Sequence, residues 1–482
     1  MKGSVIKILV LLLMLGYKLC AYGTKPADSL IYSWAGRECL VNASVGVYLQ
    51  DALTGQILGS CHAQQSLIPA STLKLITTAA ALEMLGPDYR FQTRLAFRGQ
   101  LSNDSLKGDL IIIGGGDPAL GSMFFRDYYL NPHFLKGWTD SLHQHKIRHV
   151  CGQILTDATI YDERAVPGTW IWEDIGNYYG AGVSGLSVYD NSCEIRLRSP
   201  GEQGRPVQII SVSPEETGLE FDNRLRSSED KRDLACVYGS PPDHRRIIRG
   251  TIPLGRNSFV IRASVPDPPQ LLARQLKNML EASGISVTGS TGRLNVPVQK
   301  EVTLATTFSP PLIKLIRVIN YQSVNLFAEH LLRQLAYTQT GNGSLEEGIR
   351  VLTNFWENRG INTSGLFICD GSGLSRFNAL TAEQLVQVLA YMKNKSPHSE
   401  LFYNTLPAVP DGTLYSFDQH LFPRHSLQAK SGSMTRVRCY AGILTTTSGR
   451  QIIFAVLLNN FSCSQHQAIL SIEELLAELH GL

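Results

Sequence analysis

Three short groups of residues carry side chains that could act together on a carbonyl carbon. The first lies in "PASTLKLITTAAALEMLGPDYRF", residues 69–91, where Ser71 and Lys74 stand three positions apart at the start of an apolar segment. On a helix this spacing places both side chains on one face, and a lysine in a buried helix is costly unless it has a partner or a task. The pair is therefore a candidate nucleophile with its base. The S-x-x-K pattern alone is weak evidence, because Ser228 and Lys231 repeat it inside a charged tract.

The other two groups lie much further along the chain. Ser323 and Asn325, in "NYQSVNLFAEHLL", can point the same way only in a turn or an extended bend, and taken alone such a pair is more often a helix cap. The run Lys430-Ser431-Gly432-Ser433, just before a predicted strand, combines a cation, two hydroxyls and a glycine. The glycine would let a ligand approach the backbone closely, although the run by itself could be an exposed turn.

The three groups gain meaning from their order. S-x-x-K, S-x-N and K-[ST]-G follow one another as they do in penicillin-binding proteins and class A β-lactamases. Together with "GGGDPAL", "WIWEDIGNYYGAG", "CDGSGLSRFN" and "LPAVPDGTL", the sequence resembles the D-alanyl-D-alanine carboxypeptidase/endopeptidase family of class C low-molecular-mass penicillin-binding proteins (the penicillin-binding protein 4 type, peptidase family S13). The resemblance implies an α/β (α+β) domain like that of serine β-lactamases, with an antiparallel sheet between helices and a large β-rich insertion.

The residues of the first group suggest how a serine could be activated without a histidine. A lysine amine can act as a base if it is neutral, which burial and nearby positive potential both favour. We therefore expect Ser71 to be the nucleophile and Lys74 its general base. The resemblance further implies that Ser323 relays the proton to the leaving D-alanine amine, that Asn325 holds the substrate's peptide amide and that Lys430 supplies positive potential.

The resemblance also implies how the substrate is held. Ser431 and Ser433, on either side of Gly432, would bind the terminal carboxylate, and the backbone N–H groups of Ser71 and Ser433 would form the oxyanion hole. Ser431 replaces the usual threonine but keeps the hydroxyl.

A pocket for the side chain of the stem peptide can be carried over in part. Asp174, Tyr179 and Arg376 match its aspartate, aromatic residue and arginine, and together they suit the zwitterionic end of a diaminopimelate side chain. At Thr435 the glutamine known from other members is absent, so the preferred stem-peptide residue stays undecided.

The chain has 482 residues, of which 43% are hydrophobic and 18% charged, as in ordinary globular proteins. We expect a signal peptide at 1–23, a discontinuous catalytic domain from 24–95 and 300–482, and an inserted β-rich region at 96–299 that forms one or two domains.

The first residues predict export. The apolar run "ILVLLLMLG" follows Lys2 and Lys7, and small residues end the segment, as in a cleaved signal peptide. We expect a periplasmic or other extracytoplasmic protein, with membrane association at most peripheral. An uncleaved N-terminal anchor and a lipid on Cys20 are the lesser alternatives. Eight further cysteines permit disulfides, but their spacing indicates no pairing.

Other ligands and functions are less well supported. A net charge of +3 does not favour nucleic acid, and no HExxH or CxxC pattern indicates a metal site. The resemblance implies that neither a metal nor an organic cofactor is required. The run 114–119 fits the dinucleotide pattern G-x-G-x-x-A, but no amphipathic helix follows. Peptidoglycan stem peptides and β-lactams are thus the expected partners. A β-lactamase and a non-catalytic peptidoglycan- or β-lactam-binding sensor remain the alternatives, and the balance of carboxypeptidase and endopeptidase action and the oligomeric state stay open.

Overall fold

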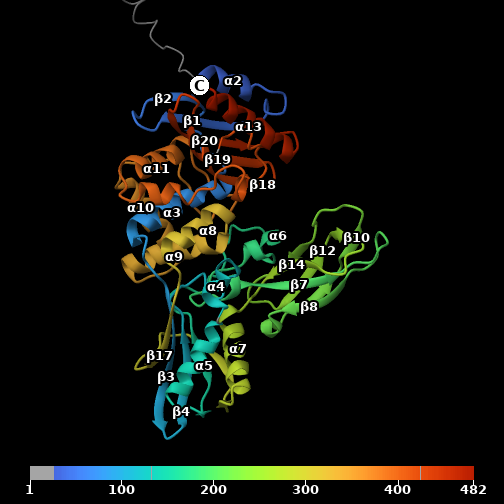
Figure 1. The fold of residues 1–482 in the computed structure, drawn as a ribbon, viewed down its shortest axis with the longest axis vertical. Helices are drawn as coiled ribbons and strands as arrows, with labels where there is room; N and C mark the ends of the chain where they lie inside the picture. Colours follow the sequence, from blue (N-terminus) through green and yellow to red (C-terminus); the bar gives the residue numbers. More distant parts are fainter. Residues whose placement is uncertain (1–26, 132, 424) are drawn as a thin grey trace, which may run out of the picture.

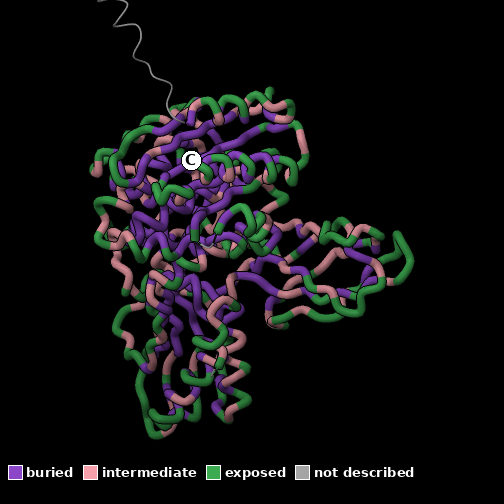
Figure 2. Tube along the Cα trace, turned by 45° about the horizontal axis from the view of Figure 1, so that its top comes forward, coloured by how far each residue is buried: buried purple, intermediate pink, exposed green. Residues whose placement is uncertain are grey.

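The computed structural model describes residues 27–482 except 132 and 424, so the expected signal peptide at 1–23 lies outside the described residues. The molecule consists of a body, a column that extends from it and an arm that projects sideways (Figure 1). Buried residues fill the body and continue along the column, whereas the tip of the arm is exposed (Figure 2). The two ends of the described chain both lie in the body.

The body is built around one five-stranded sheet in which all neighbours are antiparallel. Its strands, in spatial order, are β18 (Leu427–Met434), β19 (Val437–Thr445), β20 (Gln451–Asn459), β1 (Ser44–Asp51) and β2 (Ile57–Cys61). The central strand β20 reads "QIIFAVLLN" and is buried almost throughout, as expected where both faces of a sheet are covered. The hairpin predicted around the Thr54-Gly55 turn is present as β1 and β2.

Helices cover both faces of this sheet. Phe454 and Val456 of β20 share a hydrophobic cluster with residues of α2 (Asp28–Ala35) and α13 (Gln465–His480). Ala455 and Leu457 point to the other face and belong to the cluster that contains residues of α3 and α11. The helices of this second face are the 3₁₀ turn η1 (Ala70–Leu73), α3 (Lys74–Leu85), α8 (Leu312–Gln322), α9 (Asn325–Thr340), α10 (Leu345–Glu357), α11 (Ala382–Asn394) and α12 (Ser399–Tyr403). Leu414 of the 3₁₀ turn η6 (Gly412–Leu414) belongs to the cluster of the first face.

Two of these helices meet at Ser323. The apolar pattern continues across this position, but Ser323 has the left-handed φ of +61°, so α8 ends there and α9 begins at Asn325. The break turns the two polar side chains of the second group toward the region of Ser71.

The column contains a seven-stranded sheet. Its strands are β3 (Gln92–Ser102), β4 (Ser105–Ile113), β5 (His149–Val150), β6 (Ile154–Asp157), β15 (Ser286–Val287), β16 (Thr291–Leu294) and β17 (Val302–Phe308), with α5 (Phe134–Gln144) and α7 (Pro268–Ala282) packed beside it. Strands β3 and β17 pair with each other, so residues on both sides of positions 95 and 300 belong to the column.

The arm is made of shorter strands. They are β7 (Ser192–Arg198), β8 (Gln208–Ser213), β9 (Glu220–Asn223), β10 (Arg226–Ser228), β11 (Cys236–Tyr238), β12 (Arg245–Arg249), β13 (Thr251–Pro253) and β14 (Phe259–Ser264). Five short turns lie around its base: η2 (Met123–Phe125), α4 (Arg126–Tyr129), η3 (Tyr178–Gly180), η4 (Tyr189–Asn191) and η5 (Glu215–Thr217); α6 (Trp172–Ile175) accompanies them. The base of the arm touches α6 and η3 through the hydrogen bond from Ser264 N to Gly176 O, 2.9 Å.

In the described part of the chain all eight cysteines are free. No helix of residues 27–482, as described, has the length and apolar character needed to cross a bilayer, and the described His, Cys, Asp and Glu side chains form no group of three or more that could hold a metal ion.

Candidate active site

Ser71 and Lys74 lie where η1 passes into α3. The Lys74 Nζ is 3.0 Å from the Ser71 Oγ, and its side chain is fully buried among the apolar residues of α3. Ser71 itself is half-buried. The spacing read from the sequence therefore does bring the amine to the hydroxyl.

Two further acceptors fix the amine of Lys74. Its Nζ donates to the Asn325 Oδ1 and to the backbone carbonyl of Ser372, both at 2.6 Å. The Asn325 amide is oriented by its nitrogen, which donates to the Tyr179 carbonyl at 2.8 Å. Two N–H bonds of Lys74 are thus directed at groups that can only accept. In a neutral amine the remaining position, which faces Ser71, carries the lone pair.

Burial lowers the pKa of Lys74 from 10.5 to about 7, although the carboxylates of Asp370 and Glu329 act in the opposite direction. Glu329 is buried, and its carboxylate accepts the backbone N–H groups of Gly371, 3.1 Å, and Ser372, 2.8 Å. Burial, with the Asp370 charge second, raises the pKa of Glu329 to about 7. An amine in this setting is neutral in a large fraction of molecules near pH 7.

Three further residues of the site, Glu329, Asp370 and Ser372, carry no role that the sequence predicted. Asp370 is completely buried and accepts hydrogen bonds from Trp170, Gly373, Ser375 and Asn378. This fixes the "DGSG" loop whose carbonyl at Ser372 holds Lys74. One signal was available for Glu329, since it follows Asn325 by four positions and so shares its face of α9.

Ser323 and Lys430 form the second pair. The Lys430 Nζ donates to the Ser323 Oγ at 2.9 Å and to the Ser431 carbonyl at 2.7 Å. Burial holds the pKa of Lys430 well below its usual value, and the positive charges of Lys74 and Arg438 lower it further. Lys430 does not precede a strand, as its sequence position suggested, but lies within β18.

Gly432 lets the edge strand β18 lie against η1. A Cβ at this position would be 2.5 Å from the Pro69 carbonyl oxygen and 3.0 Å from the Ser71 N, closer than such atoms approach. The run 430–433 is therefore part of strand β18, which lies against the η1 turn that carries Ser71. Ser433 is the next residue of this strand after Gly432. Ser431 is nearly buried and Ser433 is exposed.

Two of the residues expected to bind the stem-peptide side chain, Tyr179 and Asp174, lie beside Asn325, whose side-chain nitrogen donates to the Tyr179 carbonyl. The Tyr179 hydroxyl donates to the Asp174 Oδ1 at 3.2 Å. Burial raises the pKa of Asp174, against the lowering effects of the Tyr179 hydrogen bond and the Arg376 charge. Arg376 is exposed, and so is Thr435 in the turn between β18 and β19.

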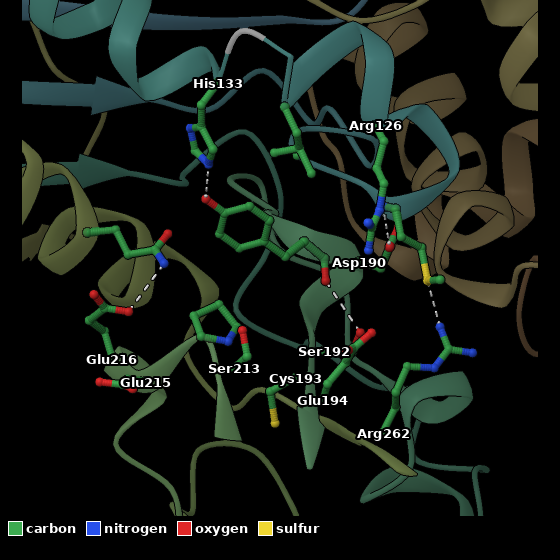
Figure 3. A pocket seen from close by; sticks show the side chains of 16 residues that line it. Arg126, His133, Asp190, Ser192, Cys193, Glu194, Ser213, Glu215, Glu216 and Arg262 are labelled. Carbon is green, nitrogen blue, oxygen red and sulfur yellow. Dashed lines mark hydrogen bonds between the residues drawn. The ribbon is translucent and has the colours of Figure 1, made fainter. Parts of the chain in front are cut away.

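A separate cavity of about 480 Å³ lies at the base of the arm (Figure 3). Arg126 and Arg262 line one side of it and Glu215 and Glu216 another. Tyr189 is also among its lining residues. The residues of the three motifs do not line this cavity. The space beside Gly116, in the glycine-rich run 114–119, is filled by the Tyr161 side chain, since a Cβ on Gly116 would lie 2.2 Å from the Tyr161 hydroxyl.

Comparison with known proteins places this geometry in a family. The sequence profile of the D-Ala-D-Ala carboxypeptidase 3 (S13) family matches residues 31–479. The D-alanyl-D-alanine carboxypeptidase of Actinomadura sp. (strain R39) is 27% identical over 437 residues, covering 88% of this chain and 79% of that protein. The D-alanyl-D-alanine carboxypeptidase DacB of Haemophilus influenzae is 23% identical over 428 residues, covering 87% of this chain and 86% of its own.

Solved structures agree with the sequence relatives. The crystal structure of penicillin binding protein 4 (dacB) from Haemophilus influenzae superposes with a TM-score of 0.81 at 22% identity and covers 94% of this chain and 99% of that one. The same protein complexed with a novel β-lactam gives a TM-score of 0.76 at 21% identity, over 93% and 98% of the two chains. The expected fold class, a penicillin-binding domain with its sheet between helices and a large β-rich insertion, is thus confirmed. Because the family profile spans nearly the whole sequence, the chain belongs to the D-Ala-D-Ala carboxypeptidase 3 (S13) family.

Proposed function

We propose that the protein is a serine D-Ala-D-Ala carboxypeptidase that removes the terminal D-alanine of peptidoglycan stem peptides and cleaves the same kind of bond in cross-links. The observation that carries this proposal is the contact between Ser71 and Lys74. A fully buried amine with a pKa of about 7 lies 3.0 Å from a serine hydroxyl in a member of this family. That is the arrangement a serine needs in order to lose its proton near neutral pH.

Acylation begins when the neutral amine of Lys74 takes the proton of the Ser71 hydroxyl. The Oγ then attacks the carbonyl carbon of the penultimate D-alanine, and the backbone N–H groups of Ser71 and Ser433 stabilise the oxyanion. The peptide C–N bond breaks as the proton taken up by Lys74 passes through Ser323, which is hydrogen bonded to Lys430, to the leaving amine, so that Lys74 is neutral again. Water then hydrolyses the ester, which frees the shortened peptide and restores the serine.

The remaining residues of the site hold the substrate. Asn325, whose amide is already oriented by Lys74 and Tyr179, would accept and donate hydrogen bonds along the substrate backbone. The hydroxyls of Ser431 and Ser433 would bind the terminal carboxylate. Asp174, with Tyr179, Arg376 and Thr435, would form the side-chain pocket.

β-Lactams would acylate the same serine, because they present a reactive carbonyl beside a carboxylate as the D-Ala-D-Ala end does. Peptidoglycan stem peptides lie outside the cytoplasm. The proposed function therefore fits the expected export and a periplasmic or extracytoplasmic location with at most peripheral membrane contact.

One experiment tests the proposed function directly. The purified protein is incubated with a muramyl pentapeptide and, separately, with a fluorescent penicillin. We expect release of D-alanine and covalent labelling in the wild type, and neither in Ser71→Ala. Labelling without D-alanine release would support a sensor, and rapid turnover of the penicillin would support a β-lactamase; either result would contradict the proposal.

A further inference from the structure

The end of β18 meets the start of α13 through one glutamine. The Gln465 Nε2 donates to the Met434 carbonyl at 2.7 Å and to the Ser433 Oγ at 3.2 Å. Gln465 is the first residue of α13, and Ser464 before it is the N-cap, which forms a capping box with Gln467. None of the three motifs includes Gln465, yet it contacts the hydroxyl of Ser433, which belongs to the third motif.

The two contacts determine which way the Ser433 hydroxyl is polarised. The Met434 carbonyl can only accept, so the amide of Gln465 must turn its nitrogen, not its oxygen, toward β18. The second N–H of that nitrogen then reaches the Ser433 Oγ, which acts as the acceptor. A hydroxyl that accepts in this way keeps its own hydrogen free to donate. Within the described chain Ser433 makes no other side-chain hydrogen bond, and it is exposed.

The surroundings of this free donor favour an anion. Arg438 lies directly opposite Ser433 in the register of β18 and β19, and its guanidinium is held by the Tyr440 hydroxyl at 2.6 and 2.9 Å. The first turn of α13, which begins at Gln465, adds the positive end of a 16-residue helix. A carboxylate that accepts from Ser433 would therefore find positive potential on two sides.

We propose that Gln465 is a positioning residue for substrate selection. By holding Ser433 as a hydrogen-bond donor, it gives the site its preference for substrates whose leaving group carries a free carboxylate. The inference rests on the proposed carboxypeptidase function and assigns a source for the carboxylate preference within it.

The test compares two substrates that differ only in the carboxylate. Both are activated thioesters with the same D-alanyl acyl group; one has mercaptoacetate as its leaving group and the other has the methyl ester of mercaptoacetate. For Gln465→Ala we expect kcat/KM to fall about tenfold on the carboxylate substrate, mainly through KM, and to change less than twofold on the ester. For Gln465→Glu the fall on the carboxylate substrate should exceed that of Gln465→Ala, since a carboxylate would make Ser433 donate inward and would repel the anion.

Gln467→Ala is the matched control, because it removes one half of the capping box of the same helix, the Gln467 side chain that accepts from the Ser464 N–H, without touching Ser433. It should lower the melting temperature slightly and leave the ratio of the two kcat/KM values unchanged. Equal losses on both substrates, an unchanged ratio in Gln465→Ala, or the same ratio change in Gln467→Ala would overturn the inference. Those results require an active wild type, so they leave the proposed function standing. A wild type inactive on both thioesters would overturn the function and this inference with it.

Discussion

At the scale of single residues, the chemistry depends on the protonation state of Lys74. Its ammonium would be surrounded by three acceptors, whereas its neutral form leaves a lone pair toward Ser71. Burial favours the neutral form, because desolvation penalises the charge. The two carboxylates nearby limit this effect and keep the pKa close to neutrality, where a base is effective.

We predict that acylation follows the titration of Lys74. The amine loses its proton as pH rises, so the rate of labelling by a fluorescent penicillin should increase about tenfold per pH unit below pH 7 and level off above it. Rates measured from pH 5 to pH 9 check this. A rate that is flat or falls over the acid range would contradict Lys74 as the base.

Glu329→Gln should move the rising part of this pH–rate curve, on the acid side, to lower pH. The Glu329 charge raises the pKa of Lys74, so its removal makes the amine easier to deprotonate. The glutamine keeps only one acceptor for the two backbone N–H groups it faces, and we expect a loss of about 1–3 kcal/mol in stability. Glu281→Gln, on α7 in the column, should leave the midpoint unchanged. A midpoint shifted to higher pH would exclude this role for Glu329.

Much of the site could be predicted at this scale, and the reason is chemical. Ser71 and Lys74 are close in sequence, so their contact follows from helix geometry alone. Glu329 and Asp370 lie far from Ser71 in sequence, and nothing in their local pattern says that they share a buried space with Lys74. The carbonyl of Ser372 could not be predicted at all, because every residue has one.

At the scale of the elements, the position of β18 against η1 decides whether the pieces of the site meet. We predict that Gly432→Ala lowers kcat/KM for D-alanine release by at least about a hundredfold, since a displacement near 1 Å can have that effect. The added Cβ would lie 2.5 Å from the Pro69 carbonyl oxygen and force the strand away. The measurement is D-alanine release together with thermal unfolding.

Gly137→Ala is the control for this substitution. Gly137 lies within α5, and a Cβ there meets no atom within 4 Å, so the variant should keep full activity and gain about 0.5–1 kcal/mol in stability. Full activity in Gly432→Ala would contradict the prediction, because it would mean that β18 can accept a Cβ at this position without moving away from η1.

The element boundaries near the motifs were harder to predict than the elements themselves. The helical pattern from 311 to 341 is continuous in hydrophobicity, but the structure breaks it at Ser323. Tertiary contacts explain the break, because Lys430 from β18 holds the Ser323 hydroxyl. Likewise, the polar run 430–433 does not read as a strand, yet it pairs along its length with β19.

At the scale of the whole molecule, the arm contacts the segment that holds the proposed substrate pocket. Arg262, on β14, lies over the ring of Tyr178 with its Cζ 3.9 Å from the ring centroid. The next residue, Tyr179, holds both Asp174 and Asn325. The sequence predicted the strands of the insertion but no role for them. In the structure, strand β14 contacts η3, and η3 in turn contacts Asn325.

We predict that Arg262→Ala lowers kcat/KM two- to fivefold for a peptide with a diaminopimelate side chain, because a partly exposed cation–π contact is worth about 0.5–1 kcal/mol. The loss should be smaller for a peptide that lacks this side chain. Arg245→Ala, on strand β12 of the arm, is the control and should change neither value. Equal effects of the two variants would indicate a general disturbance of the arm.

The hydrogen bonds of Lys74 span 251 and 298 positions of the chain, and β18 is completed only at residue 434 of 482. Until those distant segments have come together, Ser71 is an ordinary hydroxyl beside an ordinary ammonium, with a pKa above 10. An incompletely synthesised or unfolded copy of the enzyme would therefore not be acylated at Ser71, and a β-lactam would label only copies whose folding is complete.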